Sequence, residues 1–289
     1  MIKFLFTSAL SVSVLSLAAC SGGTTTAENN APKVEKAIKS TATLADIIAH
    51  PRRAEETARD QYRNPKETLE FFEVGPGKKV AEIWPGWYTN VIAPYLKEND
   101  GQYVAVLYPE GIGERLDKRI AGYKEKYSDT SVYGEIEYGA FWQDHGAILP
   151  PESVDVVLSF RNVHNWMGRG YADQAYNEFF AALKPGGILG IVEHRLPESA
   201  VQDPKGSSGY VQESYMKDQA IRAGFEFVGS SEVNANPRDT ADHPFGVWTL
   251  PPRSRLPKEG SEEAKGFDAE LFKNIGESDR ATLKFRKPF

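Results

Sequence analysis

The sequence predicts an α/β protein built on a doubly wound, mostly parallel sheet of seven strands. Apolar strand-like segments alternate with amphipathic helix-like segments between residues 79 and 224, which is typical of parallel strands with helices on both faces. Two strand-like segments, 153–160 and 188–194, are continuous apolar runs, as expected of strands buried on both faces. The last two strand-like segments, 225–233 and 245–251, follow each other without a helix, and this predicts a C-terminal β-hairpin.

Residues 1–19 have the pattern of a secretory signal. Lys3 precedes an apolar run over 4–15, which is too short for a membrane-spanning helix and ends in small residues. The only cysteine follows these small residues, at position 20. Leu17-Ala18-Ala19-Cys20 resembles the lipobox of bacterial lipoproteins, which implies cleavage before Cys20 and its lipidation. The alternative is a plain signal peptide that happens to end before a cysteine.

The residue after the cysteine bears on the expected location. In Gram-negative lipoproteins an Asp there typically retains the protein at the inner membrane, and this chain has Ser21. The resemblance therefore implies a lipid anchor in the outer membrane, with the protein facing the periplasm. Residues 20–42 are rich in Ser, Thr, Gly, Asn and Ala without an apolar period, which predicts a flexible tether.

Composition bounds the rest of the chain. A hydrophobic fraction of 40% over 289 residues is sufficient for one sizeable domain, and the net charge of −6 argues against a nucleic-acid surface. We expect the domain to span 43–250. It begins with helices over 43–74, where Pro51 and Pro65 are placed as helix starts.

The alternation itself then follows in order. The predicted elements are a strand at 79–84, a helix at 89–99, a strand at 101–109, a helix at 113–127, strands at 131–139 and 153–160, a helix at 171–183, a turn at 184–187, a strand at 188–194, a helix at 214–224 and the hairpin. Residues 251–289 are predicted as a Pro-rich, charged C-terminal extension, with a short helix at 266–276 and a strand or extended segment at 281–289. Whether this extension covers a ligand site is left open.

Three stretches resemble class I S-adenosylmethionine-dependent methyltransferases. "NEFFAALKPGGILGIVEHR" (177–195) is similar to the passage into the fifth strand of that family, and "ESVDVVLSFRNVHNW" (152–166) to its fourth strand and the polar turn after it. "AGFEFVGSSEV" (223–233) is similar to its sixth strand, and the chain shares the ending "SDRATLKFRKP" with a group of predicted methyltransferases. The resemblance implies the class I methyltransferase fold and S-adenosylmethionine as cofactor. It also implies methyl transfer to a small-molecule or lipid-like acceptor.

The first loop departs from the pattern of that family. The family usually has an acid followed by three alternating glycines, which let the cofactor approach the backbone. Here Glu82 matches the acid, Trp84 stands at the first glycine and Gly86 at the second, while the third has no match because the loop is about two residues shorter. Trp84 or Trp87 would either fill cofactor space or stack on the sulfonium. The acid that grips the ribose is also displaced, because the equivalent position is near Leu107 or Tyr108. The residues that the resemblance implies for cofactor binding are Glu82, Trp84, Gly86, Trp87, Tyr88, Glu110, Asp144 and Asn162.

Ligands of open α/β sheets bind beyond the carboxyl ends of the strands. The polar and aromatic residues expected there include Trp142, His145, Arg161, Arg195, Asp242 and His243 besides those named for the cofactor. The catalytic candidates are His164, Asn165, Glu193 and His194, of which His164 would be the general base with Asn165 or Asn162 orienting it. The alternative is that His164 is a polar residue capping the following turn.

A metal-dependent reaction is a weaker hypothesis. It would use His145, His164, His194, Glu193 or Asp144, but no pair has the spacing of a zinc motif, so no metal is predicted.

Two functions therefore remain open. One is methyl transfer from S-adenosylmethionine. The other is an exported lipoprotein that keeps the fold and binds another small ligand or an envelope partner without methyl transfer. The short loop, its two tryptophans and the lipobox motivate the second, since S-adenosylmethionine is a cytoplasmic metabolite. The partners expected in either case are a small molecule and the membrane, and no nucleic acid.

Overall fold

The computed structural model describes residues 42–289, which belong to one compact unit. The signal peptide predicted at 1–19, the lipidation predicted at Cys20 and nearly all of the tether predicted at 20–42 lie outside the described residues. Over the described part of the chain, none of the helices combines the length and the apolar character needed to cross a membrane.

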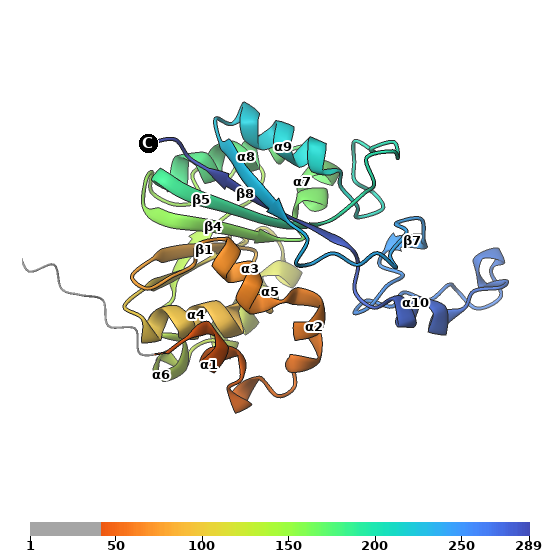
Figure 1. Ribbon diagram of the computed structural model, residues 1–289, viewed down its shortest axis with the longest axis horizontal. Coiled ribbons are helices and arrows are strands. Elements are labelled where there is room, and N and C mark those ends of the chain that lie inside the picture. The colour runs from red at the N-terminus through yellow and green to blue at the C-terminus, as the bar shows by residue number, and fades with distance from the viewer. Residues whose placement is uncertain (1–41) are drawn as a thin grey trace, which may run out of the picture. The chain divides into compact units, whose positions relative to one another are not determined.

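A seven-stranded sheet forms the centre of the fold (Figure 1), as the sequence predicts. Its strand order is β3-β2-β1-β4-β5-β8-β6, in which β1 to β5 are parallel to one another and β8 is antiparallel to both β5 and β6. The strands are β1 (Lys79–Ile83), β2 (Gln102–Leu107), β3 (Glu137–Ala140), β4 (Val154–Phe160), β5 (Leu183–His194), β6 (Glu226–Ser231) and β8 (Arg280–Arg286). The sheet order reverses direction at β1 and β4, which is where ligands of open α/β sheets bind.

Two layers of helices cover the two faces of the sheet (Figure 1). One layer contains α1 (Leu44–Ile48), α3 (Pro65–Phe71), α4 (Thr89–Glu98) and α5 (Glu114–Lys126), and the other contains α7 (Val163–Arg169), α8 (Ala172–Ala182) and α9 (Glu213–Arg222). Alternate strand residues feed the two cores. Val80 of β1 packs in the core under α3 and α4, whereas its neighbour Ala81 packs in the core under α8 and α9.

The two prolines begin helices as predicted. Pro51 opens the 3₁₀ helix η1 (Pro51–Arg53), and Pro65 opens α3. Between them lie η2 (Thr57–Arg59) and α2 (Asp60–Arg63), which bring Arg59 and Arg63 toward the edge of the sheet where β1 ends. A proline at the first helical position loses no hydrogen bond, because that N–H has no partner within the helix.

The antiparallel strand of the sheet comes from a different segment than predicted. The expectation that 245–251 forms the last strand of a hairpin is wrong, because β7 (Pro244–Val247) is short and lies outside the seven-stranded sheet. That place belongs to β8, from the predicted C-terminal extension, whose Ala281, Leu283 and Phe285 are fully buried. The apolar residues that follow β7 line a cavity instead. The extension also contains η3 (Glu262–Ala264) and the expected short helix, α10 (Ala269–Ile275).

Three smaller differences concern segments between the strands. The strand predicted at 131–139 is divided into α6 (Thr130–Tyr133), capped by Asp129, and β3. The turn predicted at 184–187 is already part of β5 and coincides with a register shift against β4, where Gly186 has a φ of 75°. The polar turn expected after β4 is helix α7, and this helix carries His164 on its first turn.

Candidate functional site

A cavity of about 350 Å³ lies at the carboxyl edge of the sheet. The loops after β1 and β4, the end of β5, helix α2 and residues 247–253 line it. Its wall includes nine of the predicted site residues, namely Glu82, Trp84, Gly86, Trp87, Tyr88, Asn162, His164, Asn165 and His194. Its volume is at the lower end of the range for small-molecule sites, so the cavity is suited to a ligand rather than to a macromolecule.

The loop after β1 keeps the backbone conformation of a glycine at a tryptophan. Trp84 has a φ of 47°, in the left-handed region that favours glycine, and its N–H donates to the Val106 carbonyl at 2.8 Å. Its indole is buried, stacks on Tyr108 with ring centroids 4.6 Å apart, and donates through Nε1 to the Phe141 carbonyl at 3.1 Å. Trp84 therefore fills the space between the ends of β1 and β2 rather than leaving it open.

Glu82 ends β1 as a buried acid held by its own loop. Its Oε1 accepts from the Gly86 N–H at 3.2 Å, and its Oε2 accepts from the Tyr103 hydroxyl at 2.6 Å. Burial raises the pKa of Glu82 to about 7, although these two hydrogen bonds act in the opposite direction. A carboxyl of this kind changes charge near neutral pH, in a wall of the cavity.

Of the remaining loop residues, Gly86 leaves its backbone open to the cavity, and Trp87 and Tyr88 form an aromatic wall. A Cβ added to Gly86 would meet no atom within 4 Å, so a ligand can approach the backbone there. Tyr88 stacks on Phe160 with centroids 3.8 Å apart, and its hydroxyl donates to the Arg63 carbonyl at 2.8 Å. The Trp87 ring lies under the Arg63 guanidinium at 4.9 Å, and its buried Nε1 has no partner among the described residues.

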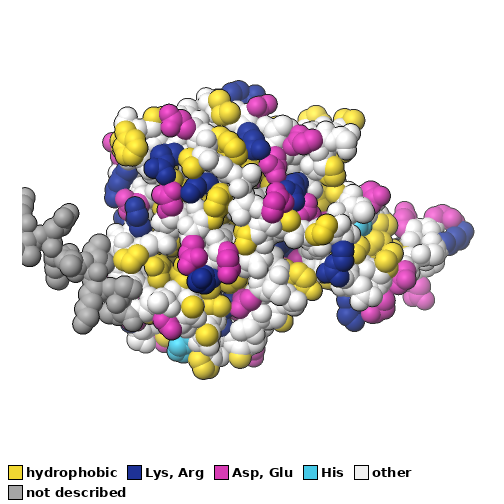
Figure 2. Space-filling view, in the orientation of Figure 1, with side chains coloured by type: hydrophobic (Ala, Val, Ile, Leu, Met, Phe, Trp, Pro, Cys, Tyr) yellow, Lys and Arg dark blue, Asp and Glu magenta, His cyan; other side chains and the backbone are white. Residues whose placement is uncertain are grey.

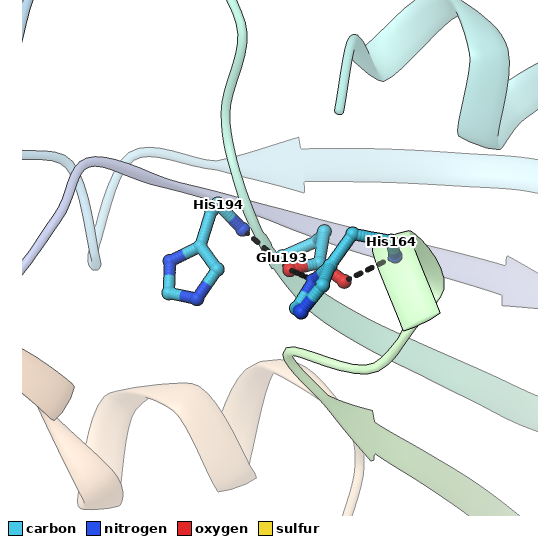
Figure 3. Close-up of side chains that lie close together, drawn as sticks. All are labelled: His164, Glu193 and His194. Carbon is cyan, nitrogen blue, oxygen red and sulfur yellow. Dashed lines mark hydrogen bonds and ion pairs between the residues drawn. The ribbon is translucent and has the colours of Figure 1, made fainter. Parts of the chain in front are cut away.

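His164 and Glu193 form a buried pair behind the cavity (Figure 3). His164 lies in the first turn of α7 and Glu193 is the second-last residue of β5, and the imidazole Nδ1 lies 3.1 Å from Glu193 Oε1. Glu193 Oε2 accepts from the Val163 N–H at 2.6 Å, which fixes the carboxylate against the start of the helix. Because an ionised carboxylate only accepts, the His164 proton lies on Nδ1.

The other nitrogen of His164 is then the one that accepts. Nε2 lies 3.1 Å from the Asn165 amide nitrogen, which fits an amide donating to this nitrogen. Trp248 packs edge-on against the imidazole at 6.1 Å between ring centroids. This arrangement of carboxylate, imidazole and accepting Nε2 at a cavity can take a proton from a ligand.

His194 is a neutral neighbour rather than a second base. Its Nδ1 lies 2.5 Å from the Ser278 hydroxyl, and its ring is buried. Burial, together with His164, Arg280 and Arg161, holds the pKa of His194 well below its usual range. A histidine with so low a pKa binds a proton weakly, and of the two imidazoles only that of His164 is held by a carboxylate, so His164 is the candidate general base.

His164, Glu193 and His194 also offer three ligand atoms within 4.8 Å of one another. The carboxylate oxygens already accept from the N–H groups of Val163 and His194, and His194 Nδ1 is hydrogen-bonded to Ser278. Guanidinium groups nearby would repel a dication. The surroundings therefore favour a hydrogen-bonded catalytic group over a metal centre.

Several predicted rim residues lie elsewhere. Glu110 is exposed and paired with Lys124 Nζ at 2.7 Å, and Asp144 is exposed, so neither lines the cavity. In the loops after β2 and β3, Tyr108 and Phe141 contact Trp84, whereas Glu110 and Asp144 lie further along and face solvent. His145 lines a separate surface pocket, and His243 binds Asp239 at 2.8 Å. Asn162 lines the cavity but donates to the Ile83 carbonyl at 3.0 Å, which ties the ends of β4 and β1 together.

Arginines are the feature that sequence reasoning missed. Arg63 comes from α2 and Arg280 from the start of β8, and both line the cavity beside Arg161. Neither Arg63 nor Arg280 follows a parallel strand, so the rule about strand ends does not find them. The shared ending that contains Arg280 was the available signal, and no local pattern marks Arg63.

The sequence matches no protein-family model and no functionally curated protein. Solved structures resemble the fold. The 4+2 cyclase SpnF has a TM-score of 0.52 and 17% identity, with 78% of this chain and 81% of that chain covered. A proposed methyltransferase of Bacillus halodurans C-125 has a TM-score of 0.50 and 15% identity, with 78% of this chain and 100% of that chain covered. Because these two are named for different reactions, the likeness concerns architecture. The chain has the α/β fold of class I methyltransferases.

Proposed function

We propose that this protein is an S-adenosylmethionine-dependent methyltransferase that acts on a small or lipid-like acceptor, with His164 as general base. The observation that carries the proposal is the His164–Glu193 pair, whose Nδ1 to Oε1 distance is 3.1 Å and whose histidine lines the cavity beside the first loop. Glu193 orients the imidazole, and Nε2 takes the proton of an O–H or N–H acceptor that replaces the Asn165 amide as the partner of this nitrogen.

The cavity offers contacts for the cofactor at one end. Glu82 and the open backbone at Gly86 are the residues that would hold its amino-acid part, and the unpartnered Trp87 Nε1 is a free donor in the same wall. S-adenosylmethionine supplies an electrophilic methyl group when it is bound. The contribution of the protein is then to position the acceptor and to remove its proton.

A second candidate function is supported by Trp84. This indole fills the space between β1 and β2, and Glu110, the acid expected to bind the ribose, is exposed and engaged with Lys124. A protein of this kind would keep the fold and bind another small ligand, or an envelope partner, without methyl transfer. An exported location would favour it, since the cofactor is cytoplasmic.

Calorimetric titration of the purified full-length protein with S-adenosylmethionine and S-adenosylhomocysteine separates the two candidates. Methyl transfer requires that S-adenosylmethionine binds. Gly86→Trp should abolish this binding, because the indole would fill the open space beside the Gly86 backbone. The absence of binding at millimolar ligand would refute the proposed methyl transfer. If Trp84→Gly then binds S-adenosylhomocysteine where the natural protein does not, the second candidate is correct.

Turnover tests the role of His164. Labelled methyl groups would be followed from S-adenosylmethionine into an extract of small molecules and lipids from the producing cells. His164→Ala should keep cofactor binding and lose roughly a hundredfold to ten-thousandfold in rate. His145→Ala is the matched control, because His145 is exposed outside the cavity. Equal rates for the two variants would show that His164 is not the base.

We also propose that the mature chain is anchored through a lipid on Cys20, in the outer membrane and facing the periplasm. The support is the Leu17-Ala18-Ala19-Cys20 motif at the end of the signal-like segment and Ser21 after it. Cys20→Ala should move the protein from the membrane fraction to the soluble fraction. Retention of that variant in the membrane fraction would refute the anchor.

A further inference from the structure

Three arginines bind one carboxylate beside the cavity, and a fourth arginine lies near them. Arg59 Nε and Arg63 Nε donate to Glu277 at 2.6 and 3.2 Å, and Arg280 donates to it through Nη2. The fourth, Arg161, lies close enough to raise the electrostatic cost of charging Arg63. The side chains of Arg63, Arg280 and Glu277 are no more than 3% exposed, so water does not neutralise this excess of positive charge.

Donors in this cluster are also left over. Arg63 Nη2 and Arg280 Nε are buried without a partner, and among residues 42–289 the Arg161 side chain makes no hydrogen bond or ion pair. Arg161 moreover has a φ of 63°, which a residue with a side chain rarely adopts. Strained backbone and unpaired buried donors persist where a ligand uses them.

Two other buried or half-buried arginines, Arg53 and Arg195, are matched by carboxylates. Arg53 makes two hydrogen bonds to Asp60, at 2.7 and 3.1 Å. Arg195 binds three carboxylates, those of Glu213, Glu232 and Asp279. On the face shown in Figure 2, acidic and basic side chains are likewise interspersed. Arg53 and Arg195 therefore each have at least one carboxylate of their own, whereas Arg59, Arg63 and Arg280 have only Glu277 between them.

We propose that Arg63, Arg161 and Arg280 bind an anionic group, a carboxylate or a phosphate, on the acceptor. The inference rests on the proposed function, in that it assigns the substrate class of the same cavity. Planar guanidinium groups donate in pairs to the oxygens of such groups, which matches the unpartnered donors that remain. The body of the acceptor would lie against the stacked rings of Tyr88 and Phe160.

The position of the arginines suits an acceptor that also reaches the base. Arg161 leads into α7, which carries His164 three residues later, and Arg161 and Arg280 both act on the charge of His194. An anionic group at the arginines therefore brings the rest of the molecule next to His164. The positive charge of the cavity would be increased by a cationic cofactor, and an anionic acceptor offsets it.

The test is calorimetric binding of inorganic phosphate and of succinate to the purified full-length protein in a neutral detergent. Both probes should bind if the oxyanion alone is recognised. The probe with the higher affinity then shows whether the acceptor carries a phosphate or a carboxylate. Arg161→Gln should weaken binding at least about tenfold, because charge-assisted hydrogen bonds are lost. The same substitution should leave the midpoint of thermal unfolding unchanged or higher, since the Arg161 side chain makes no hydrogen bond or ion pair with residues 42–289.

Arg119→Gln is the matched control, because Arg119 lies at the Tyr108 end of the same cavity. It should change affinity by less than about twofold, since an exposed charge at a distance is screened. Arg161→Lys keeps the positive charge but loses the paired N–H donors of the guanidinium. Its affinity for the probes should lie between the affinities of the natural protein and of Arg161→Gln. Equal losses in Arg119→Gln and Arg161→Gln would refute specific binding by the cluster.

A titration of phosphate in saturating S-adenosylhomocysteine separates the two proposals. Simultaneous binding supports an anionic acceptor. If S-adenosylhomocysteine excludes phosphate, the arginines hold the carboxylate of the cofactor, and the acceptor assignment is overturned while methyl transfer stands. If phosphate binds and S-adenosylhomocysteine does not, the anion site stands and methyl transfer fails. If neither probe binds, the anion site is refuted.

Discussion

Glu277→Gln removes the one carboxylate that three arginines bind and keeps its size. Burial alone would raise the pKa of Glu277, but Arg280 and Arg63, with a hydrogen bond from Arg59, lower it to about 2 from 4.5. A difference of about 2.5 pKa units, at about 1.4 kcal/mol each, gives about 3 kcal/mol of stability at neutral pH. The variant also leaves buried guanidiniums without a counter-charge, for which losses of about 3–5 kcal/mol are typical.

The sign of the pH dependence follows from the lowered pKa. A carboxyl whose folded pKa is depressed stabilises the fold fully above its unfolded value and loses this contribution as the pH falls toward the folded value. The difference in unfolding free energy between the natural protein and Glu277→Gln should therefore be constant above about pH 4.5. It should narrow between about pH 4.5 and 2.

Urea unfolding followed by circular dichroism measures both quantities. Glu232→Gln is the control, because Arg195 keeps Glu213 and Asp279 when Glu232 is lost. The control should cost less than about 1 kcal/mol, as exposed ion pairs do. A loss below about 1 kcal/mol for Glu277→Gln at neutral pH, or a difference that does not change on acidification, would refute the electrostatic reasoning.

Three further predictions concern the fold and the first loop. Glu82→Gln should raise the unfolding free energy above about pH 7 and have a much smaller effect near pH 4.5. The reason is that the pKa of Glu82 is raised to about 7, so ionisation of this carboxyl in the folded protein costs stability. Parallel pH profiles of unfolding free energy for the variant and the natural protein would contradict this. Phe285→Ala should cost about 3–5 kcal/mol in urea unfolding, since Phe285 is fully buried in β8; a cost typical of a surface residue would show that β8 is not part of the sheet. Asn162→Ala should cost about 1 kcal/mol through the lost bond to the Ile83 carbonyl and leave S-adenosylhomocysteine affinity unchanged, and a selective loss of affinity in calorimetry would instead assign Asn162 to ligand binding.

The parallel part of the sheet was predictable because its signals are local. Each of β1, β2 and β4 is an apolar run followed by a polar turn, and the crossover rule then orders them. The antiparallel strand was not predictable in this way. Residues 245–251 and 281–289 both have the pattern of a strand, and which of them pairs with β5 depends on residues that are distant in the sequence. The segment after Gly246 is apolar because it lines the cavity, whereas β8 is apolar only at alternate residues, Ala281, Leu283 and Phe285.

The same distinction applies to the site. His164, Glu193 and Glu82 were found because each follows or ends a parallel strand, and parallel strands end at one edge. Glu110 and Asp144 also follow parallel strands, but both side chains are exposed and neither lines the cavity. The arginines of α2 and β8 reach the edge from the two ends of the described chain, so only the folded structure brings them together.

The first loop places a tryptophan where the resemblance predicts a glycine. Trp84 retains the positive φ that a glycine would supply, so the backbone path from β1 into α4 is preserved without the glycines. The indole fills the space beside Tyr108, and the remaining cavity extends toward Arg63, Arg161 and Arg280. Trp84 therefore limits the size of the ligand at one end of the cavity, and the arginines select an anionic group at the other end. Trp84→Gly combined with Arg161→Gln tests this division. The two changes should have additive effects on phosphate affinity, since no contact joins the two side chains among the described residues, and strong coupling between them would contradict it.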